Sequence, residues 1–168
     1  MTDDGFRQFV EARYGELLRT AFLLTGTQHA AEDLLQTSLL KLMSKWKDLD
    51  EPMAYLYRIM VNQRTSVWRQ IGSRELLTDV LPARSTPDAS ELVAQRDELL
   101  SALDRLPAKT RSVLVLRYWL DISEADTAEI LGCSVGSVKS QASRGLARLR
   151  DVLRPRTHEL TPKEVLAS

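Results

Sequence analysis

"EADTAEILGCSVGSVKSQASRGLARLR", residues 124–150, carries the local signals of two short helices joined by a tight turn. Ser123 suits an N-cap for the first helix, with Asp126 three residues on, an arrangement close to a capping box. Gly132 stands where a helix would end in the left-handed conformation, and Ser134 suits the N-cap of the next helix. The spacing predicts a helix-turn-helix over these residues.

The second of these helices is expected to turn hydroxyl, amide and cationic side chains outward. Hydroxyls and amides hydrogen-bond to base edges, while lysine and arginine meet phosphates or guanine. The stretch holds no catalytic histidine, no carboxylate pair and no glycine-rich phosphate loop. Taken alone, it fits a solvated amphipathic helix equally well. The residues expected to face outward are Ser137, Lys139, Ser140, Gln141, Ser143 and Arg144.

Charge is unevenly distributed along a chain whose formal net charge is zero. The 168 residues are 27% charged and 43% apolar, which is the composition of a globular protein. Acidic residues exceed basic ones over residues 1–51, whereas bases exceed acids over 54–75 and 135–156. Two separated basic patches suit an extended polyanion better than a compact ligand.

Several classes of site and location are not expected. The single Cys133 cannot form an intramolecular disulfide or a multi-cysteine zinc site, and His29 and His158 are isolated. The acidic start "MTDDGFRQF" lacks the pattern of a signal peptide, and no apolar run is long enough for a membrane span. We therefore expect no metal, no cofactor, no membrane association and a reducing, cytoplasmic setting.

Helical periodicity runs through most of the sequence, and the alternation typical of strands is absent. The pattern predicts an all-α fold of two small helical domains joined by a flexible linker. The first domain should break at "TGT" (25–27), and its next helix should start near His29 and turn Leu35, Leu42 and Met43 inward. A third helix should begin at Pro52, since proline suits a first helical turn. The predicted ranges are 1–72 for the first domain, 73–89 for the linker, 90–154 for the second domain and 155–168 for a tail.

The third predicted helix, "AYLYRIMVNQRTSVWRQ" (54–70), interleaves aromatic and basic side chains. Stacking surfaces beside cations are what single-stranded nucleic acid needs from a protein. Tyr55 and Ile59 are better explained as core residues, whereas Arg64, Trp68 and Arg69 lie nearer the exposed end of the helix. This helix is therefore a second possible nucleic-acid site.

Three ordered motifs resemble one known family, the sigma-70 superfamily, within it the short extracytoplasmic-function (ECF) sigma factors and most closely their actinobacterial SigE-like group. "AEDLLQ" (31–36) is similar to the polymerase-binding signature, and residues 54–70 are similar to the element that opens the promoter −10 region. Residues 103–150 resemble sigma domain 4, with "GSVKSQASRGLARLR" in its recognition helix. The resemblance covers nearly the whole chain, from about Phe6 to Arg154.

The resemblance implies a non-enzymatic subunit that docks on core RNA polymerase, selects promoters and helps to melt them. Its partners would be the clamp helices of the largest subunit, the flap of the second subunit and promoter DNA. The resemblance also allows an anti-sigma factor as a partner. The residues that it implies are Asp33, Gln36 and Leu39 for polymerase binding; Arg58, Asn62, Arg64, Trp68 and Arg69 for the −10 element; and Ser137, Lys139, Ser140, Ser143 and Arg144 for the −35 element.

The sequence departs from the family pattern in its last helices. Thr127 and Ala142 replace larger apolar residues, and Gln141 replaces a common basic residue. Gly145 replaces alanine at a cost of about 1 kcal/mol in helix propensity. Cys133 is expected to be a small buried side chain. A dimeric helix-turn-helix repressor would explain the second half of the chain but leave residues 31–36 and 54–70 without a role. An adaptor that uses its helices for protein contacts alone is a further alternative, and its activity would survive charge reversal at Arg144.

Overall fold

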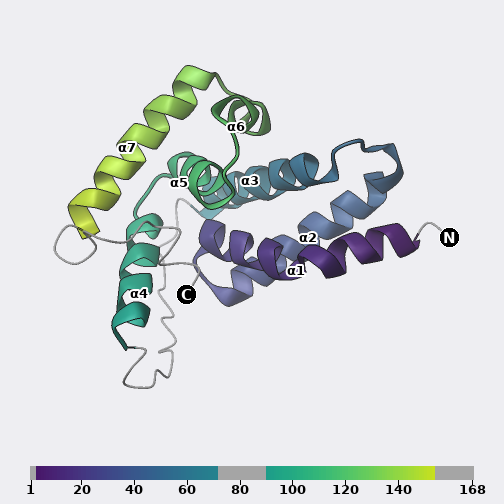
Figure 1. Cartoon of the computed structure of the whole chain (residues 1–168), viewed down its shortest axis with the longest axis horizontal. Coiled ribbons are helices and arrows are strands. Elements are labelled where there is room, and N and C mark those ends of the chain that lie inside the picture. Colours follow the sequence, from purple (N-terminus) through teal and green to yellow (C-terminus); the bar gives the residue numbers. More distant parts are fainter. Residues whose placement is uncertain (1–2, 72–89, 154–168) are drawn as a thin grey trace.

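The structure is a computed structural model that describes the backbone of residues 3–71 and 90–153 and the side chains of residues 4–64 and 92–153. The regular structure of these ranges is entirely helical, as predicted (Figure 1). The predicted linker and tail, 73–89 and 155–168, lie outside the described residues. The elements are α1 (Asp3–Thr25), α2 (Gln28–Lys45), the 3-10 turn η1 (Trp46–Asp48), α3 (Pro52–Ile71), α4 (Ser90–Asp104), α5 (Ala108–Leu114), the π-helical segment η3 (Val115–Trp119), α6 (Glu124–Leu131) and α7 (Val135–Leu153).

The helices of the first half begin where local chemistry predicts. Gly26 breaks the chain after α1 with φ +94°, a conformation that favours glycine. Thr27 then caps α2, because its Oγ1 accepts a hydrogen bond of 3.2 Å from the backbone N–H of Ala30. Pro52 is the first residue of α3, as expected for a residue without an N–H to donate.

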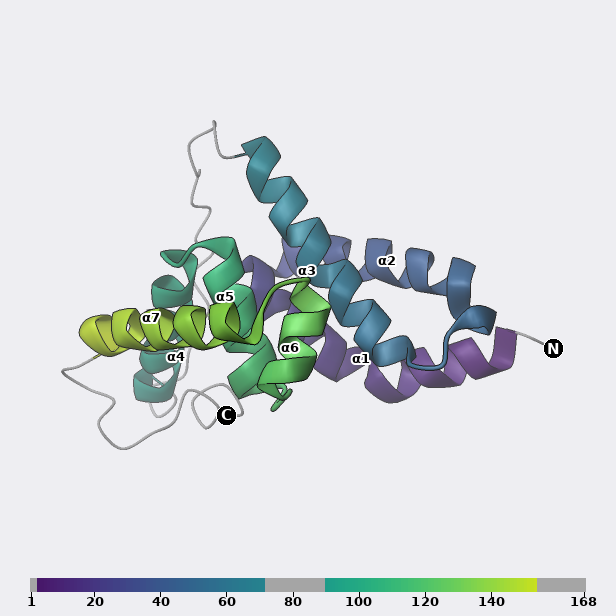
Figure 2. The same cartoon turned by 90° about the horizontal axis from the view of Figure 1, so that it is seen from above.

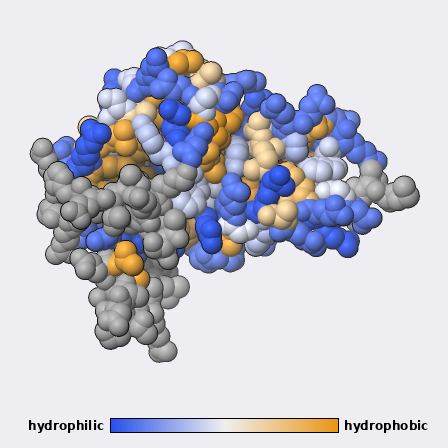
Figure 3. Space-filling view, in the orientation of Figure 1, coloured by the Kyte–Doolittle hydropathy of each residue, from blue (hydrophilic) through white to orange (hydrophobic). Residues whose placement is uncertain are grey.

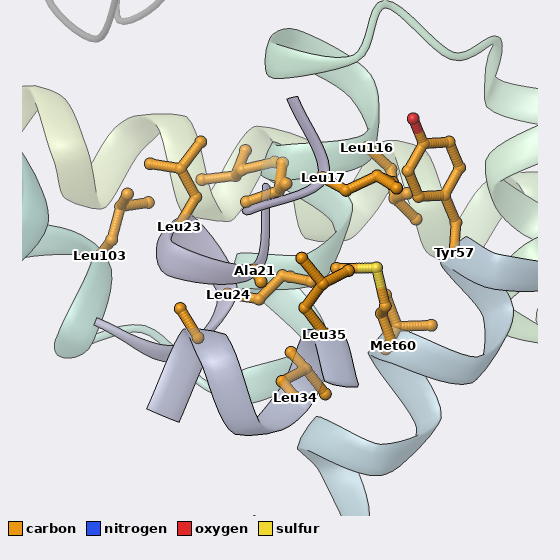
Figure 4. Packing of buried hydrophobic residues seen from close by; sticks show 14 of the residues in the cluster. Leu17, Ala21, Leu23, Leu24, Leu34, Leu35, Tyr57, Met60, Leu103 and Leu116 are labelled. Atoms are coloured by element: carbon orange, nitrogen blue, oxygen red, sulfur yellow. The ribbon is translucent and has the colours of Figure 1, made fainter. Parts of the chain in front are cut away.

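Helices α1, α2 and α3 pack around a row of fully buried side chains. Leu17, Ala21 and Leu24 lie three and four residues apart on one face of α1. Leu35 from α2 and Met60 from α3 meet this face (Figure 4). The two helices therefore hold α3 in place by ordinary apolar packing, with its middle turns against the core.

Met43 does not face inward as the sequence analysis expected. Its side chain is 50% exposed, whereas Leu35 and Leu42 of the same helix are fully buried. Ala31 and Ser38 complete the buried row at intervals of three and four residues. This row fixes the rotation of α2, and Met43, one residue after Leu42, is turned about 100° away from it.

The two halves of the chain share one hydrophobic core in this structure. Leu103 of α4 and Leu116 of η3 belong to the same buried cluster as Leu17 and Leu23 of α1, and Figure 4 shows them side by side. Figures 1 and 2 both place α5 and α6 against α3. The contact between α1–α3 and α4–α7 is called the seam below.

Arg111 of α5 lies at the centre of the seam with only 3% of its side chain exposed. Its Nε donates to the carbonyl oxygen of Leu23 at 2.5 Å, and its Nη1 pairs with Asp104 of α4. Arg64 of α3 donates its Nε to the next carbonyl, that of Leu24, at 2.7 Å. Two guanidinium groups therefore satisfy the C-terminal end of α1, where carbonyls lack helical partners and the helix dipole is negative.

Arg111 is expected to stabilise the folded chain, because its loss leaves the Leu23 carbonyl buried without a donor. We predict that Arg111→Met lowers the free energy of unfolding by about 1.5–3 kcal/mol, the range for a hydrogen bond made by a charged group. Arg105→Met, at an exposed site in the turn between α4 and α5, is the control and should change it by less than about 0.5 kcal/mol. Urea unfolding measures both, and equal effects would contradict this role of Arg111.

Candidate nucleic-acid interface

The predicted helix-turn-helix forms with the predicted caps. The Ser123 Oγ accepts from the backbone N–H of Asp126 at 3.0 Å and donates to its carboxylate at 2.7 Å. Gly132 ends α6 in the left-handed conformation, with φ +63°. The Ser134 Oγ accepts from the N–H of Ser137 at 3.1 Å and so caps α7. The turn between α6 and α7 therefore comes from glycine and serine chemistry that the sequence shows directly.

Helix α7 turns most of the predicted DNA-reading residues to solvent. Lys139, Ser143 and Arg144 are exposed, and Ser137 and Ser140 are partly buried at the edge of the same face. Figure 3 shows hydrophilic residues along the outer edge of α7 and hydrophobic ones on its inner side. The arrangement offers cations and hydroxyls along one side of a supported helix, which is the chemistry that contacts phosphates and base edges.

Gln141 differs from this expectation, because its side chain is partly buried and its Oε1 accepts a hydrogen bond from the hydroxyl of Thr110 in α5. One turn later, Gly145 is buried where α5 and α7 approach closely. A Cβ at this position would lie 2.8 Å from Leu114 Cδ1 and 2.9 Å from Thr110 Cγ2. Gly145, although unfavourable for helix formation, is thus required by the close packing of α5 and α7.

The other unusual residues of this region line its small core. Ala142 is buried with Val113, Ala128 and Val138, and Cys133 is partly buried against the same cluster. Thr127 is fully buried, and its hydroxyl has no hydrogen-bond partner within the described structure. Small side chains in this core allow α7 to pack closely on α5 and α6 to pack closely on α7.

Helix α3 brings two of its predicted −10 residues to the surface and turns a third inward. Arg58 and Asn62 are exposed and lie four residues apart, so they share one face of the helix. Arg64 is half-buried against Leu24, and burial, followed by repulsion from Arg111, lowers the pKa of its guanidinium. The side chains of Trp68 and Arg69 lie outside the described residues. All these DNA-binding roles remain predictions.

The exposed face of α3 is close to the second half of the chain. Arg58 Nη2 lies 3.9 Å from Glu129 Oε1 of α6, with the two side chains 44% and 77% exposed. A pair this exposed contributes about 0–1 kcal/mol to stability. On α7, Lys139 Nζ lies 3.7 Å from Glu124 Oε2 in a similarly open pair. Acidic residues of α6 therefore contact a cation of each predicted DNA site without burying it.

Helix α2 carries the residues predicted to bind polymerase. Asp33 and Gln36 are exposed, and Leu39 is partly buried against the core. Leu40 and Met43, which the sequence analysis did not place at this surface, have side chains that are 63% and 50% exposed. These two residues continue the line of Asp33 and Gln36 at intervals of three and four residues, a spacing that could have revealed them. Leu40 and Met43 thus place two exposed apolar side chains beside Asp33 and Gln36 on α2.

Within residues 3–71 and 90–153, no three His, Cys, Asp or Glu side chains gather closely enough to hold a metal ion. None of the helices described there is both long and apolar enough to cross a membrane.

Comparison with known proteins gives matches to both halves of the chain. The family model "Sigma-70 region 2" matches residues 9–74, and "Sigma-70, region 4" matches residues 96–149. The RNA polymerase sigma-E factor of Streptomyces coelicolor is 42% identical over 88% of this chain and 85% of its own length. The ECF RNA polymerase sigma factor SigD of Mycobacterium tuberculosis is 30% identical over 86% of this chain and 69% of its own length.

Two solved structures share the fold. The sigma factor RpoE in complex with the anti-sigma factor NepR from Bartonella quintana gives a TM-score of 0.73 at 25% identity, over 90% of this chain and 98% of that one. CnrH in complex with the cytosolic domain of CnrY gives 0.67 at 24% identity, over 92% and 91%. With both family regions present in order, the chain belongs to the sigma-70 family as an ECF RNA polymerase sigma factor, which recognises promoters at the initiation of transcription.

Proposed function

We propose that this sigma factor binds core RNA polymerase through α2, reads the −10 element with α3 and reads the −35 element with α7. The observation that carries the proposal is the helix-turn-helix that holds Lys139, Ser143 and Arg144 on the open side of α7. Exposed Arg58 and Asn62 supply the second DNA surface on α3. The partners on polymerase would be the clamp helices of the largest subunit and the flap of the second subunit.

The proposal also covers the mode of action of the protein and its cellular location. Its chemistry is hydrogen bonding and charge pairing with DNA, so we propose no catalytic activity and a cytoplasmic setting. The structures of RpoE with NepR and of CnrH with CnrY are both complexes with another protein. Because the former is described as an anti-sigma complex, we propose that an anti-sigma factor is a further partner of this chain.

Arg144 is the residue of α7 best suited to a guanine or phosphate contact. We predict that Arg144→Ala costs about 1–3 kcal/mol at −35. Run-off transcription by the reconstituted holoenzyme should fall about 5- to 150-fold on promoters that need the −35 element. The control is Arg150→Ala, also exposed but near the C-terminal end of α7, where recognition helices make fewer base contacts. Similar losses in the two variants would contradict the assignment.

Asn62 is exposed on α3 and offers an amide that can bind a base taken out of the stack. Extraction of a base costs a few kcal/mol, which contacts in the bound state must recover. We predict that Asn62→Ala keeps its affinity for core polymerase and forms fewer open complexes, measured by permanganate reactivity of −10 thymines. Exposed Gln28→Ala, at the start of α2, is the control. A loss of polymerase affinity as large as the loss of open complexes in the Asn62 variant would contradict this assignment.

Leu40 and Met43 are expected to extend the polymerase-binding surface of Asp33 and Gln36. We predict that Leu40→Ser weakens binding to core polymerase about 10- to 150-fold, since burial of a leucine side chain in a complex is worth about 1.5–3 kcal/mol. The matched control is Leu92→Ser on α4, which removes a leucine that is 46% exposed elsewhere. Titration of labelled sigma factor with core enzyme measures both, and unchanged affinity in Leu40→Ser would place the interface elsewhere.

A further inference from the structure

Thr110 of α5 contacts α7 through both ends of its side chain. It is 4% exposed, its hydroxyl donates to Gln141 Oε1, and its methyl group faces Gly145. Gln141 and Gly145 lie four residues apart, on successive turns of the same face of α7. One side chain thus makes a polar contact to one turn of α7 and a close apolar contact to the next.

These contacts leave α7 little freedom to rotate or slide on α5. The hydrogen bond is directional, and a Cβ at Gly145 would be only 2.9 Å from Thr110 Cγ2. Side-chain ends lie about 6 Å from a helix axis, so a rotation of about 20° would shift them by about 2 Å. Hydrogen bonds to bases tolerate about 0.5 Å in length. The rotation of α7 therefore decides which side chains can reach base edges.

We propose that Thr110 is a positioning residue for −35 recognition, which sets the rotation of α7 through Gln141 and Gly145. The inference rests on the proposed role of α7 as the −35 reader. Thr110 itself is buried and does not touch DNA. It acts on Lys139, Ser140, Ser143 and Arg144 together, because these residues project from the helix that it holds.

The test measures base discrimination rather than activity alone. Reconstituted holoenzyme transcribes a panel of promoters that carry single-base changes in the −35 element, and the readout is the ratio of transcription from the preferred to the changed promoters. Thr110→Val keeps the shape and removes the hydroxyl, and should reduce this ratio about three- to tenfold. Thr110→Ser keeps the hydroxyl and should retain most of the discrimination.

Ser112→Ala is the matched control. Ser112 is also buried in α5, but its hydroxyl donates to the Ala108 carbonyl of its own helix at 2.9 Å. This variant should keep the discrimination ratio even if it loses as much thermal stability as Thr110→Val. Gln141→Leu should reduce the ratio as Thr110→Val does, and the double variant should lose no more than either, since both remove the same hydrogen bond.

A uniform fall in transcription with an unchanged ratio in Thr110→Val would overturn the inference and leave Thr110 a packing residue. Arg144→Ala in the same panel separates this result from a failure of the proposed function. If Arg144→Ala reduces the ratio and Thr110→Val does not, the positioning role alone fails. If neither variant changes it, and joint replacement of Lys139, Ser143 and Arg144 by alanine does not either, α7 is not the −35 reader and both proposals fail.

Discussion

The hydrogen bond from Arg111 to the Leu23 carbonyl is the constraint on which the arrangement of the halves depends. It joins residues 88 positions apart, beside the apolar core that the two halves share. Burial lowers the pKa of the Arg111 guanidinium, and Asp104 opposes that shift. Arg64 of α3 donates a hydrogen bond to the next carbonyl, that of Leu24, so the last turn of α1 is bound by helices from both halves of the chain. The end of α1 therefore fixes where α3 and α5 lie.

Helix α5 links the seam to the predicted DNA reader. Arg111 points to α1, while its neighbour Thr110 contacts α7, so two consecutive residues, about 100° apart around one short helix, contact different helices. Both are almost fully buried, and both bond to groups outside their own helix. A movement of α5 that breaks the Arg111 contact to α1 would therefore also strain the Thr110 contact to α7, because the interior is closely packed. The rotation of α7 is thereby tied to the same core that holds α1.

Local chemistry explains what could be predicted from the sequence. Gly132 and the serines at 123 and 134 define the turn, because caps depend on neighbours within a few residues. The direction of Arg64 and the need for glycine at 145 could not be predicted in this way. Both depend on contacts with helices at least 30 residues away in the chain, and a pattern of neighbouring residues does not predict such contacts. The rotation of α2, which exposes Met43, has the same cause.

Reading of the −10 element by α3 and of the −35 element by α7, as proposed, requires the seam to open. Elements centred at −10 and −35 are about 25 base pairs apart, or about 85 Å of duplex at 3.4 Å per base pair. In the seam, Arg58 of α3 lies 3.9 Å from Glu129 of α6, and α7, which follows α6, is only about 28 Å long. Opening would hydrate Arg111, whose buried Nη2 has no hydrogen-bond partner among the described residues, and so offset part of the lost hydrogen bonding. The main cost of opening is then the exposure of apolar side chains such as Leu103 and Leu116, so a partner that opens the chain has to cover them.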